Sequence, residues 1–257
     1  MRTAATTRAV AAVLLNDPVS VPPGPARSNP RSRERANREN PLHVPVRALL
    51  FDFNGTLSDD EHVQCEIYRR LFAEQGRPLP AEQYYAELAG FSDEEIVERW
   101  LGAGHPAAPH VLAERIRLFR ESITDGSSVS PQVREAVRAA VGRAKLALVS
   151  GASRGEVEAV LRAAGLEVFD AVVTMEDVAR GKPDPEGYLR ALELLGVEPG
   201  DAVALEDTEP GVASAKAAGV YTVGVLGTMG PERLAAADEL VEHVDSALVE
   251  RLLGWEG

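Results

Sequence analysis

Cysteine is almost absent from this chain, and hydrophobic runs long enough to cross a membrane are missing. The single cysteine, Cys65, excludes a disulfide within the chain and fits a reducing cytoplasm. The apolar run at residues 9–15 is too short to span a bilayer. We therefore expect a cytoplasmic protein without a membrane partner.

Positive charge is also scarce. Residues 1–46 hold seven arginines against three acidic residues, a formal charge of +4, so the rest of the chain carries −17 within the total of −13. A body this acidic repels phosphate backbones and anionic lipid surfaces. This balance argues against nucleic acid or a membrane as the main partner.

The N-terminal part differs in composition from the rest. Residues 1–45 are rich in proline and arginine and have little apolar surface with which to offset the entropy of ordering. We predict a disordered extension over 1–45, followed by a folded part that starts abruptly at Val46. With 45% hydrophobic and 26% charged residues, the chain as a whole has the composition of a globular protein.

The first folded stretch is a nearly continuous apolar run at 46–53 that contains Asp52 and meets the turn signal Asn54-Gly55. Such a run predicts a buried strand that carries a carboxylate at its C-terminal edge. In open α/β sheets the ligand crevice lies outside these edges, so Asp52 is placed to act as a nucleophile or a metal ligand. The alternative is an aspartate that only caps the turn.

The stretch from residue 60 to about 126 has a helical pattern. Apolar residues recur there at three- and four-residue spacings interrupted by Gly and Pro, and Ser92 followed by Glu95 predicts a capping box. Helices are expected to include 96–101 and 109–122. Because no strand signal separates them, we predict a helical cap at 60–126, inserted into an α/β core formed by 46–59 and 127–257.

After this insertion, strands and helices alternate, which predicts a doubly wound parallel sheet. Polar side chains follow three of the predicted strands, namely Asp52, Ser150 and Asp207, and Lys182 lies in a loop shortly after another strand. The predicted strands after the first are 145–149, 171–174, 202–205 and 221–225, and the predicted helices are 131–142, 156–164, 186–195 and 212–218.

Four segments at these strand ends resemble the motifs of the haloacid dehalogenase superfamily: 51–57 (FDFNGTL), 148–153 (LVSGAS), 181–185 (GKPDP) and 205–212 (LEDTEPGV). The resemblance covers 46 to about 250. Ser150 follows Asp52 by 98 positions, which suits the branch with a helical cap, similar to β-phosphoglucomutase and its phosphatase relatives. The resemblance implies that the protein is a hydrolase of a small phosphorylated metabolite.

The resemblance also implies roles for individual residues. Asp52 is expected to attack phosphorus and form an aspartyl-phosphate, and Mg²⁺ is expected on Asp52, the Asn54 backbone carbonyl and Asp207, with Glu206 beside them.

Lys182 is expected to offset the negative charge of this site, while the Ser150 hydroxyl and backbone N–H groups near Gly151 hold phosphoryl oxygens. The structural alternatives are a solvated loop lysine and a serine that caps the next helix.

Asn54 departs from the pattern, because phosphatases that resemble this chain usually carry a second aspartate there as the acid and base. Asparagine does not exchange a proton near neutral pH. Three interpretations remain open: a leaving group that needs no proton, a substitute among Asp60, Glu61 and His62, or a phosphometabolite-binding protein with little or no turnover. Deamidation at Asn54-Gly55 is a fourth, and a phosphomutase is an alternative to the phosphatase.

Two related chemistries are disfavoured. Phosphonate-cleaving members of the superfamily use a cap lysine, and this chain has no lysine before Lys145. Dehalogenating members lack a magnesium site, whereas the acidic pair Glu206-Asp207 is present here.

Overall fold

The computed structural model describes residues 45–122 and 125–254. The extension predicted at 1–45 lies outside these ranges apart from Pro45, which is exposed. No helix within the described ranges is both long enough and apolar enough to cross a membrane.

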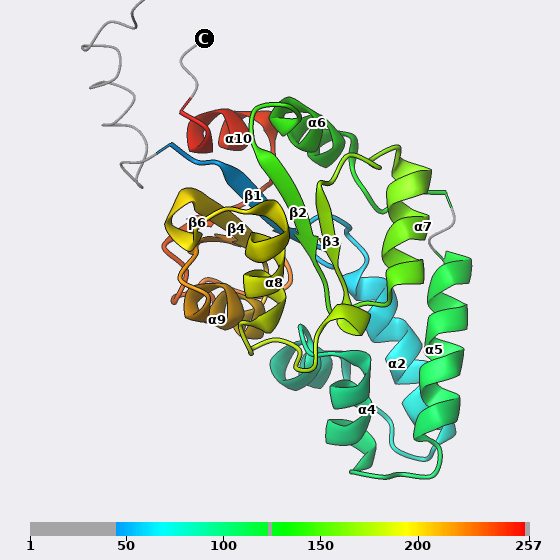
Figure 1. Ribbon diagram of the computed structural model, residues 1–257. Coiled ribbons are helices and arrows are strands. Elements are labelled where there is room, and N and C mark those ends of the chain that lie inside the picture. The colour runs from blue at the N-terminus through cyan, green and yellow to red at the C-terminus, as the bar shows by residue number, and fades with distance from the viewer. Residues whose placement is uncertain (1–44, 123–124, 255–257) are drawn as a thin grey trace, which may run out of the picture.

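The centre of the fold is a six-stranded sheet in which every pairing is parallel (Figure 1). The order is β3-β2-β1-β4-β5-β6, so the chain winds outward from β1 first in one direction and then in the other. The predicted doubly wound sheet is confirmed. The strands are β1 (Ala48–Asp52), β2 (Lys145–Val149), β3 (Ala171–Val173), β4 (Ala202–Glu206), β5 (Tyr221–Val225) and β6 (Glu239–Val241).

Helices cover both faces of this sheet. Along β1, Leu49 and Phe51 pack into one apolar cluster and Ala48 and Leu50 into the other, as the alternation of a strand buried on both faces requires. The first cluster includes residues of α6 (Pro131–Ala140), α7 (Arg154–Ala164) and α10 (Ser246–Leu252), and the second includes residues of α8 (Glu186–Leu195) and α9 (Glu209–Ala217).

A helical segment, residues 61–122, is inserted between β1 and β2. In Figure 1 it lies below the sheet, at the end where β1 and β2 finish. The rings of Tyr68, Phe72 and Trp100 stack in succession within it. The capping box of Ser92 and Glu95 is confirmed at the start of α4. The segment consists of α2 (Glu61–Glu74), α3 (Ala81–Gln83), the π-helical turn η1 (Tyr84–Leu88), α4 (Asp93–Leu101) and α5 (Ala108–Ser122).

Several predicted boundaries are wrong by a few residues, and local hydrogen bonds explain two of them. Helix α9 begins at Glu209 rather than 212, because Thr208 caps it and accepts from the Gly211 N–H. Helix α7 begins at Arg154 rather than 156, because Ser153 and Glu156 form a capping box. The first strand is shorter than 46–53, and the helix predicted at 131–142 ends at Ala140.

Candidate active site

Three carboxylates meet where β1 and β4 end. Asp52 is the last residue of β1, Glu206 is the last residue of β4, and Asp207 follows it. One carboxylate oxygen from each residue lies within 4.8 Å of the other two, and all three residues are buried. The strand order changes direction between β1 and β4, which is where ligands of doubly wound sheets bind. Residues far apart in the sequence are thus brought together at the expected place.

Lys182 joins this cluster from the loop between β3 and α8. Its Nζ donates to Asp52 Oδ1 and to Glu206 Oε1, the latter at 2.7 Å, and its side chain is only 9% exposed. Burial lowers the pKa of Lys182, but the two carboxylates raise it more, so the ammonium form is stabilised. The alternative of a solvated loop lysine is therefore wrong.

The two acidic residues at the end of β4, Glu206 and Asp207, hold protons more tightly than free carboxylates. Burial raises the pKa of Glu206 to about 7 despite its contact with Lys182, and the Tyr188 hydroxyl donates to Glu206 Oε1 at 2.5 Å. Burial, together with Asp52 and Glu206, raises the pKa of Asp207 well above its ordinary value. One buried ammonium group is therefore too little positive charge for three neighbouring carboxylates.

The turn after β1 leaves room for Asp207 only because it contains glycine. Gly55 has a φ of +84°, and a Cβ placed on it would lie 1.8 Å from Asp207 Oδ2. The next residue, Thr56, donates its hydroxyl to Asp207 Oδ1 at 3.2 Å. The Asn54-Gly55 turn therefore places the end of β1 and the end of β4 in direct contact.

Ser150 and Gly151 follow β2 and lie on the same side of the site as Lys182. The Ser150 Oγ accepts a hydrogen bond from the Ala152 N–H at 2.9 Å, and the Ser150 backbone N–H donates to the Val173 carbonyl. Ser150 does not cap the following helix, because Ser153 takes that position in α7. The structural alternative for Ser150 is therefore wrong.

Asn54 is held by Asp60, which the sequence indicated only as a substitute acid. Its Nδ2 donates to Asp60 Oδ1 at 2.9 Å, and the Ser58 hydroxyl donates to Asp60 Oδ2 at 2.5 Å. Burial raises the pKa of Asp60 to about 7, although both hydrogen bonds lower it. Asp60 thus anchors the turn behind Asn54.

Two cavities reach these residues from the helical segment. A small one of about 40 Å³ lies beside Asp52, and a larger one of about 880 Å³ lies beside Ser150 and includes Ser92 and Glu95 of α4. Gly151 and Lys182 line both. Other residues around the small cavity are Asn54, Glu61, Gln64, Tyr84, Gly90, Phe91, Asp93, Ile96, Arg115, Ala152 and Thr208.

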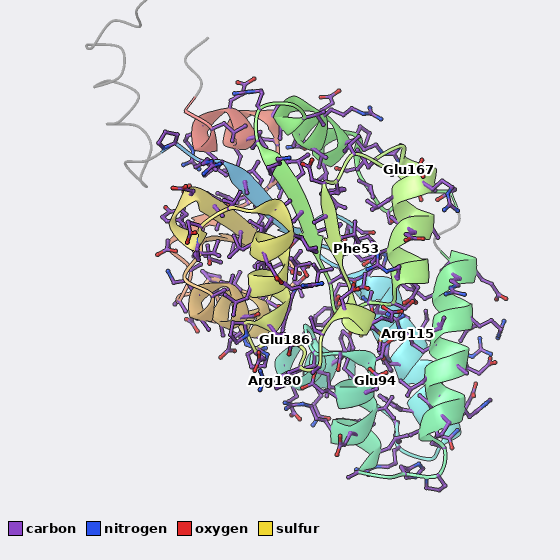
Figure 2. The ribbon with its side chains drawn as sticks, in the orientation of Figure 1. Phe53, Glu94, Arg115, Glu167, Arg180 and Glu186 are labelled. Atoms are coloured by element: carbon purple, nitrogen blue, oxygen red, sulfur yellow. The ribbon has the colours of Figure 1, made fainter. Side chains whose placement is uncertain are left out.

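The loop that carries Lys182 is fixed by Glu186, at the start of α8. The Glu186 carboxylate accepts the backbone N–H groups of Ala179 and Arg180 at 2.9 and 3.1 Å. Figure 2 shows Arg180 of this loop next to Glu186 of α8, and Glu94 of α4 near them. These bonds define the shape of the loop and thereby the position of the lysine.

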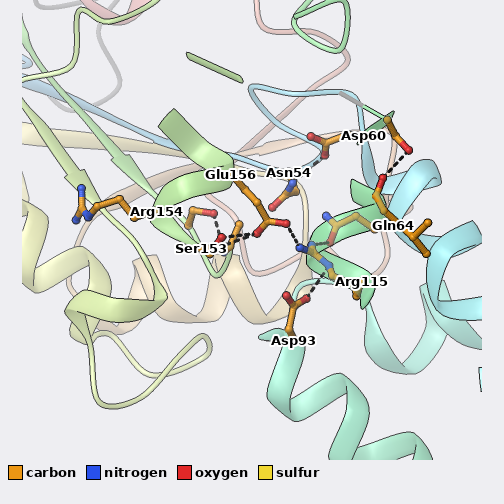
Figure 3. A network of polar contacts seen from close by, with 12 residues as sticks. Asn54, Asp60, Gln64, Asp93, Arg115, Ser153, Arg154 and Glu156 are labelled. Carbon is orange, nitrogen blue, oxygen red and sulfur yellow. Dashed lines mark hydrogen bonds and ion pairs between the residues drawn. The ribbon is translucent and has the colours of Figure 1, made fainter. Parts of the chain in front are cut away.

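A buried charged network links the helical segment to the sheet domain, and sequence reasoning missed it. Arg115 of α5 is 1% exposed and lies between Asp93 of α4, Gln64 of α2 and Glu156 of α7 (Figure 3). The Asp93 Oδ1 to Arg115 Nε distance is 3.1 Å, and the same carboxylate oxygen accepts from the Tyr68 hydroxyl at 2.5 Å. One arginine therefore holds three helices of the segment to α7.

The sequence contained a signal for this arginine. Val111, Arg115 and Phe119 follow one another at four-residue spacing and form the buried face of α5. A charged residue in the middle of an apolar stripe indicates a buried partner. The periodicity identifies the position but not the partners.

A family model of haloacid dehalogenase-like hydrolases matches residues 49–225. The chain belongs to this family. The predicted resemblance is confirmed, and so is the predicted enzyme class, a haloacid dehalogenase-like phosphatase, since several similar proteins are named as phosphatases.

Three similar proteins illustrate the likeness. Validoxylamine A 7'-phosphate phosphatase from Streptomyces hygroscopicus is 32% identical over 77% of this chain and 94% of its own length. β-Phosphoglucomutase from Bacillus subtilis is 30% identical over 82% of this chain and 96% of its own length. A crystal structure of a CbbY mutant from Rhodobacter sphaeroides with xylulose-1,5-bisphosphate is 30% identical, covers 77% of this chain and 95% of that one, and has a TM-score of 0.69.

Proposed function

We propose that this protein is a Mg²⁺-dependent phosphatase of a small phosphorylated sugar, with Asp52 as the nucleophile. The observation that carries the proposal is the cluster of Asp52, Glu206 and Asp207 with a single buried lysine at the switch point of the sheet. Relatives named for validoxylamine A 7'-phosphate, phosphorylated carbohydrates and fructose 1-phosphate support this substrate class.

The residues present fit a magnesium ion. Mg²⁺ takes oxygen ligands, and three buried carboxylates with oxygens within 4.8 Å supply them while lacking enough positive charge of their own. Asp52, Asp207 and the Asn54 backbone carbonyl would hold the ion, with Glu206 beside it. Magnesium would neutralise the negative charge of the phosphoryl oxygens.

The chain's own groups can carry out phosphoryl transfer. Asp52 would attack phosphorus and become an aspartyl-phosphate, which water then hydrolyses. Lys182 lies against Asp52 and would balance charge that builds up on the transferred group. Ser150 and Gly151 line the adjoining cavity with Lys182 and would hold phosphoryl oxygens.

Residues 60–126 would act as a cap over the core formed by 46–59 and 127–257. The close approach of Gly90 to Thr208 supports this, because a Cβ on Gly90 would lie 2.6 Å from Thr208 Oγ1. Ser92 and Glu95 face the same cavity as Ser150. Such a cap would exclude water from the site and select the leaving group.

Asn54 favours a second candidate, a phosphometabolite-binding protein with little turnover, since general acid–base help is typically worth about 10² to 10⁴ in rate. A phosphomutase is a third candidate, since relatives from Bacillus subtilis and Mycobacterium bovis are named β-phosphoglucomutase. Mutase activity would transfer the phosphoryl group from Asp52 back to a sugar rather than to water.

The test compares Mg²⁺-dependent phosphate release over a panel of sugar phosphates for the wild type, Asp52→Ala and Asn54→Asp. The proposal expects turnover in the wild type that is lost with EDTA and in Asp52→Ala. Activity that emerges only in Asn54→Asp would identify the binder, and a transphosphorylated sugar instead of free phosphate would identify a mutase. A peptide map that shows only asparagine at position 54 would exclude deamidation.

A further inference from the structure

The small cavity beside Asp52 is lined by a carboxylic acid that has no role in the function proposed above. Phosphate-ester cleavage needs a proton for the departing alkoxide, and Asn54 does not supply one. The residues just downstream are Asp60, Glu61 and His62, and their positions differ. A substitute for the missing acid must reach the cavity that Asp52 lines.

Two of the three do not meet this requirement. His62 is mostly exposed and pairs loosely with Asp59, so it lies on the outer side of the turn. Asp60 is fully buried, both of its oxygens are occupied by Asn54 and Ser58, and it lines neither cavity beside Asp52.

Glu61 is placed differently. It is the first residue of α2, it is buried, and it lines the small cavity together with Asp52, Asn54 and Lys182. The Tyr84 hydroxyl donates to Glu61 Oε1 at 2.7 Å, while Gln64 makes only a long contact of 3.4 Å with Oε2. One oxygen is therefore firmly oriented, and the other has capacity left for a partner in the cavity.

Asp93 is the remaining carboxylate of this cavity. Its Oδ1 is bound by both Arg115 and the Tyr68 hydroxyl. Asp93 therefore belongs to the ionic network around Arg115, whereas the hydrogen-bond partners of Glu61 are the neutral groups of Tyr84 and Gln64.

We propose that Glu61 is the general acid and base of this enzyme and takes over the proton transfers that Asn54 cannot perform. The inference rests on the proposed phosphatase function with Asp52 as nucleophile.

The two chemical steps balance with this assignment. In the first, Asp52 forms a bond to phosphorus, the bond from phosphorus to the sugar oxygen breaks, and the Glu61 carboxyl gives its proton to that oxygen. In the second, the Glu61 carboxylate takes a proton from water, whose oxygen attacks phosphorus while the bond to Asp52 breaks. Inorganic phosphate leaves, and both side chains return to their starting states.

The surroundings of Glu61 suit a group that both gives and takes a proton. The pKa of Glu61 is raised to about 7, mainly by burial and also by Asp52 at the end of β1, against the lowering effect of the Tyr84 hydroxyl of η1. Arg115 of α5 lowers it and Asp93 of α4 raises it by smaller amounts. Asp207, which follows β4, and Asp60 are also close enough to interact electrostatically with Glu61.

The experiment compares two substrates in wild type and Glu61→Gln, which keeps the shape and the acceptor for Tyr84. One is the best sugar phosphate of the panel, whose alkoxide needs a proton, and the other is p-nitrophenyl phosphate, whose phenolate leaves as a stable anion. We expect kcat for the sugar phosphate to fall by about 10² to 10⁴ in Glu61→Gln. With p-nitrophenyl phosphate, the first step should survive and the second should stall, giving a burst of about one phenolate per chain followed by slow release.

The burst also shows that the variant is folded and that Asp52 still attacks, which a merely structural role of Glu61 would not predict. His62→Gln is the matched control, because His62 is an exposed neighbour of Glu61. This variant should have the kcat of the wild type and should show no burst. If Glu61→Gln does not fold, Glu61→Asp should fold and retain partial turnover, because it keeps the carboxyl group on a shorter side chain.

Sugar-phosphate turnover within threefold of wild type in Glu61→Gln would overturn the inference. So would a loss of turnover with a retained burst in Asp60→Asn but not in Glu61→Gln, which would move the role to Asp60. Full activity in Asp52→Ala, or a wild type that releases no phosphate from any substrate, would instead overturn the proposed function and the inference with it.

Discussion

Replacing Arg115 with methionine is expected to destabilise the protein strongly. Methionine has a similar length but no charge, so the change removes the guanidinium group and leaves the apolar part of the side chain largely filled. Asp93 and Glu156 would then lie in the interior without their shared cation. The stacking of the guanidinium over the Phe119 ring, at 4.7 Å from its centroid, would also be lost.

Removing one partner from a buried ion pair typically costs about 3 to 5 kcal/mol, because it leaves an uncompensated charge. Here two contacts limit the loss. Glu156 keeps its bond from the Ser153 hydroxyl at 2.8 Å, and Asp93 keeps its bond from Tyr68. We therefore expect about 3 kcal/mol, the lower end of that range, which is a large part of the roughly 5 to 15 kcal/mol that stabilises a typical domain.

The cost should also depend on pH. Burial already raises the pKa of Glu156, opposed by Arg115. Without Arg115 this pKa rises further in the folded state, whereas in the unfolded chain it stays near its ordinary value. The folded variant then binds a proton that the unfolded chain has lost, so its stability falls as the pH rises. The difference from wild type should be larger at pH 8 than at pH 5.

Urea unfolding followed by far-UV circular dichroism at these two pH values measures the effect. Arg117→Met is the matched control, because Arg117 lies on the same helix and also pairs with two carboxylates, Glu114 and Glu121, but is half exposed. Its urea midpoint should barely change. Equal shifts for both variants, or a cost below about 1 kcal/mol for Arg115→Met, would refute the reasoning.

Two further predictions concern the turn after β1. Burial raises the pKa of Asp60 to about 7, so the stability of the wild type should decline between about pH 4 and 7. Asp60→Asn should therefore be more stable than the wild type at pH 8, by at most about 4 kcal/mol, but not at pH 4. Urea titrations at both pH values measure this, and a variant less stable than the wild type at pH 8 would contradict it. Gly55→Ala should lose the magnesium-induced rise in melting temperature and on the order of 10² in phosphate release, because its Cβ would overlap Asp207. Gly76→Ala controls for backbone strain, since Gly76 has a similar φ of +72° but open space around it, and an equal magnesium response in both variants would count against the close approach.

The strand ends of this fold could be predicted from the sequence because their physics is local. An apolar run that ends in a polar residue and a turn signal specifies where a buried strand stops, and parallel strands stop at the same edge. This was enough to bring Asp52, Ser150 and Asp207 to one edge of the sheet. Strand β6 was missed because none of its three residues is buried, so it lacks the apolar run that identified the equally short β3.

The contacts between helices could not be predicted, because they join residues without any regular spacing. Arg115 meets Glu156, 41 residues later, and Gln64, 51 residues earlier. Helical periodicity shows that each residue lies on a buried face, yet the partner depends on how three helices cross. The same holds for Glu61, whose partner Tyr84 lies 23 residues away in a π-helical turn.

The surplus of carboxylates in the site should couple binding of the proposed magnesium ion to the release of protons. Burial raises the pKa of Glu206 to about 7 and that of Asp207 well above its ordinary value, so both carboxylates bind protons more tightly than free carboxylates do. Magnesium requires ionised oxygens, so these protons must leave when it binds. The affinity of the site for Mg²⁺ should therefore increase as the pH rises through 7. Calorimetric titration with Mg²⁺ at pH 7, in two buffers that differ in ionisation enthalpy, should show about one proton released per ion in wild type and fewer in Asp207→Asn. Equal heats in both buffers would mean that the carboxylates are already ionised, and that Lys182 alone balances their charge.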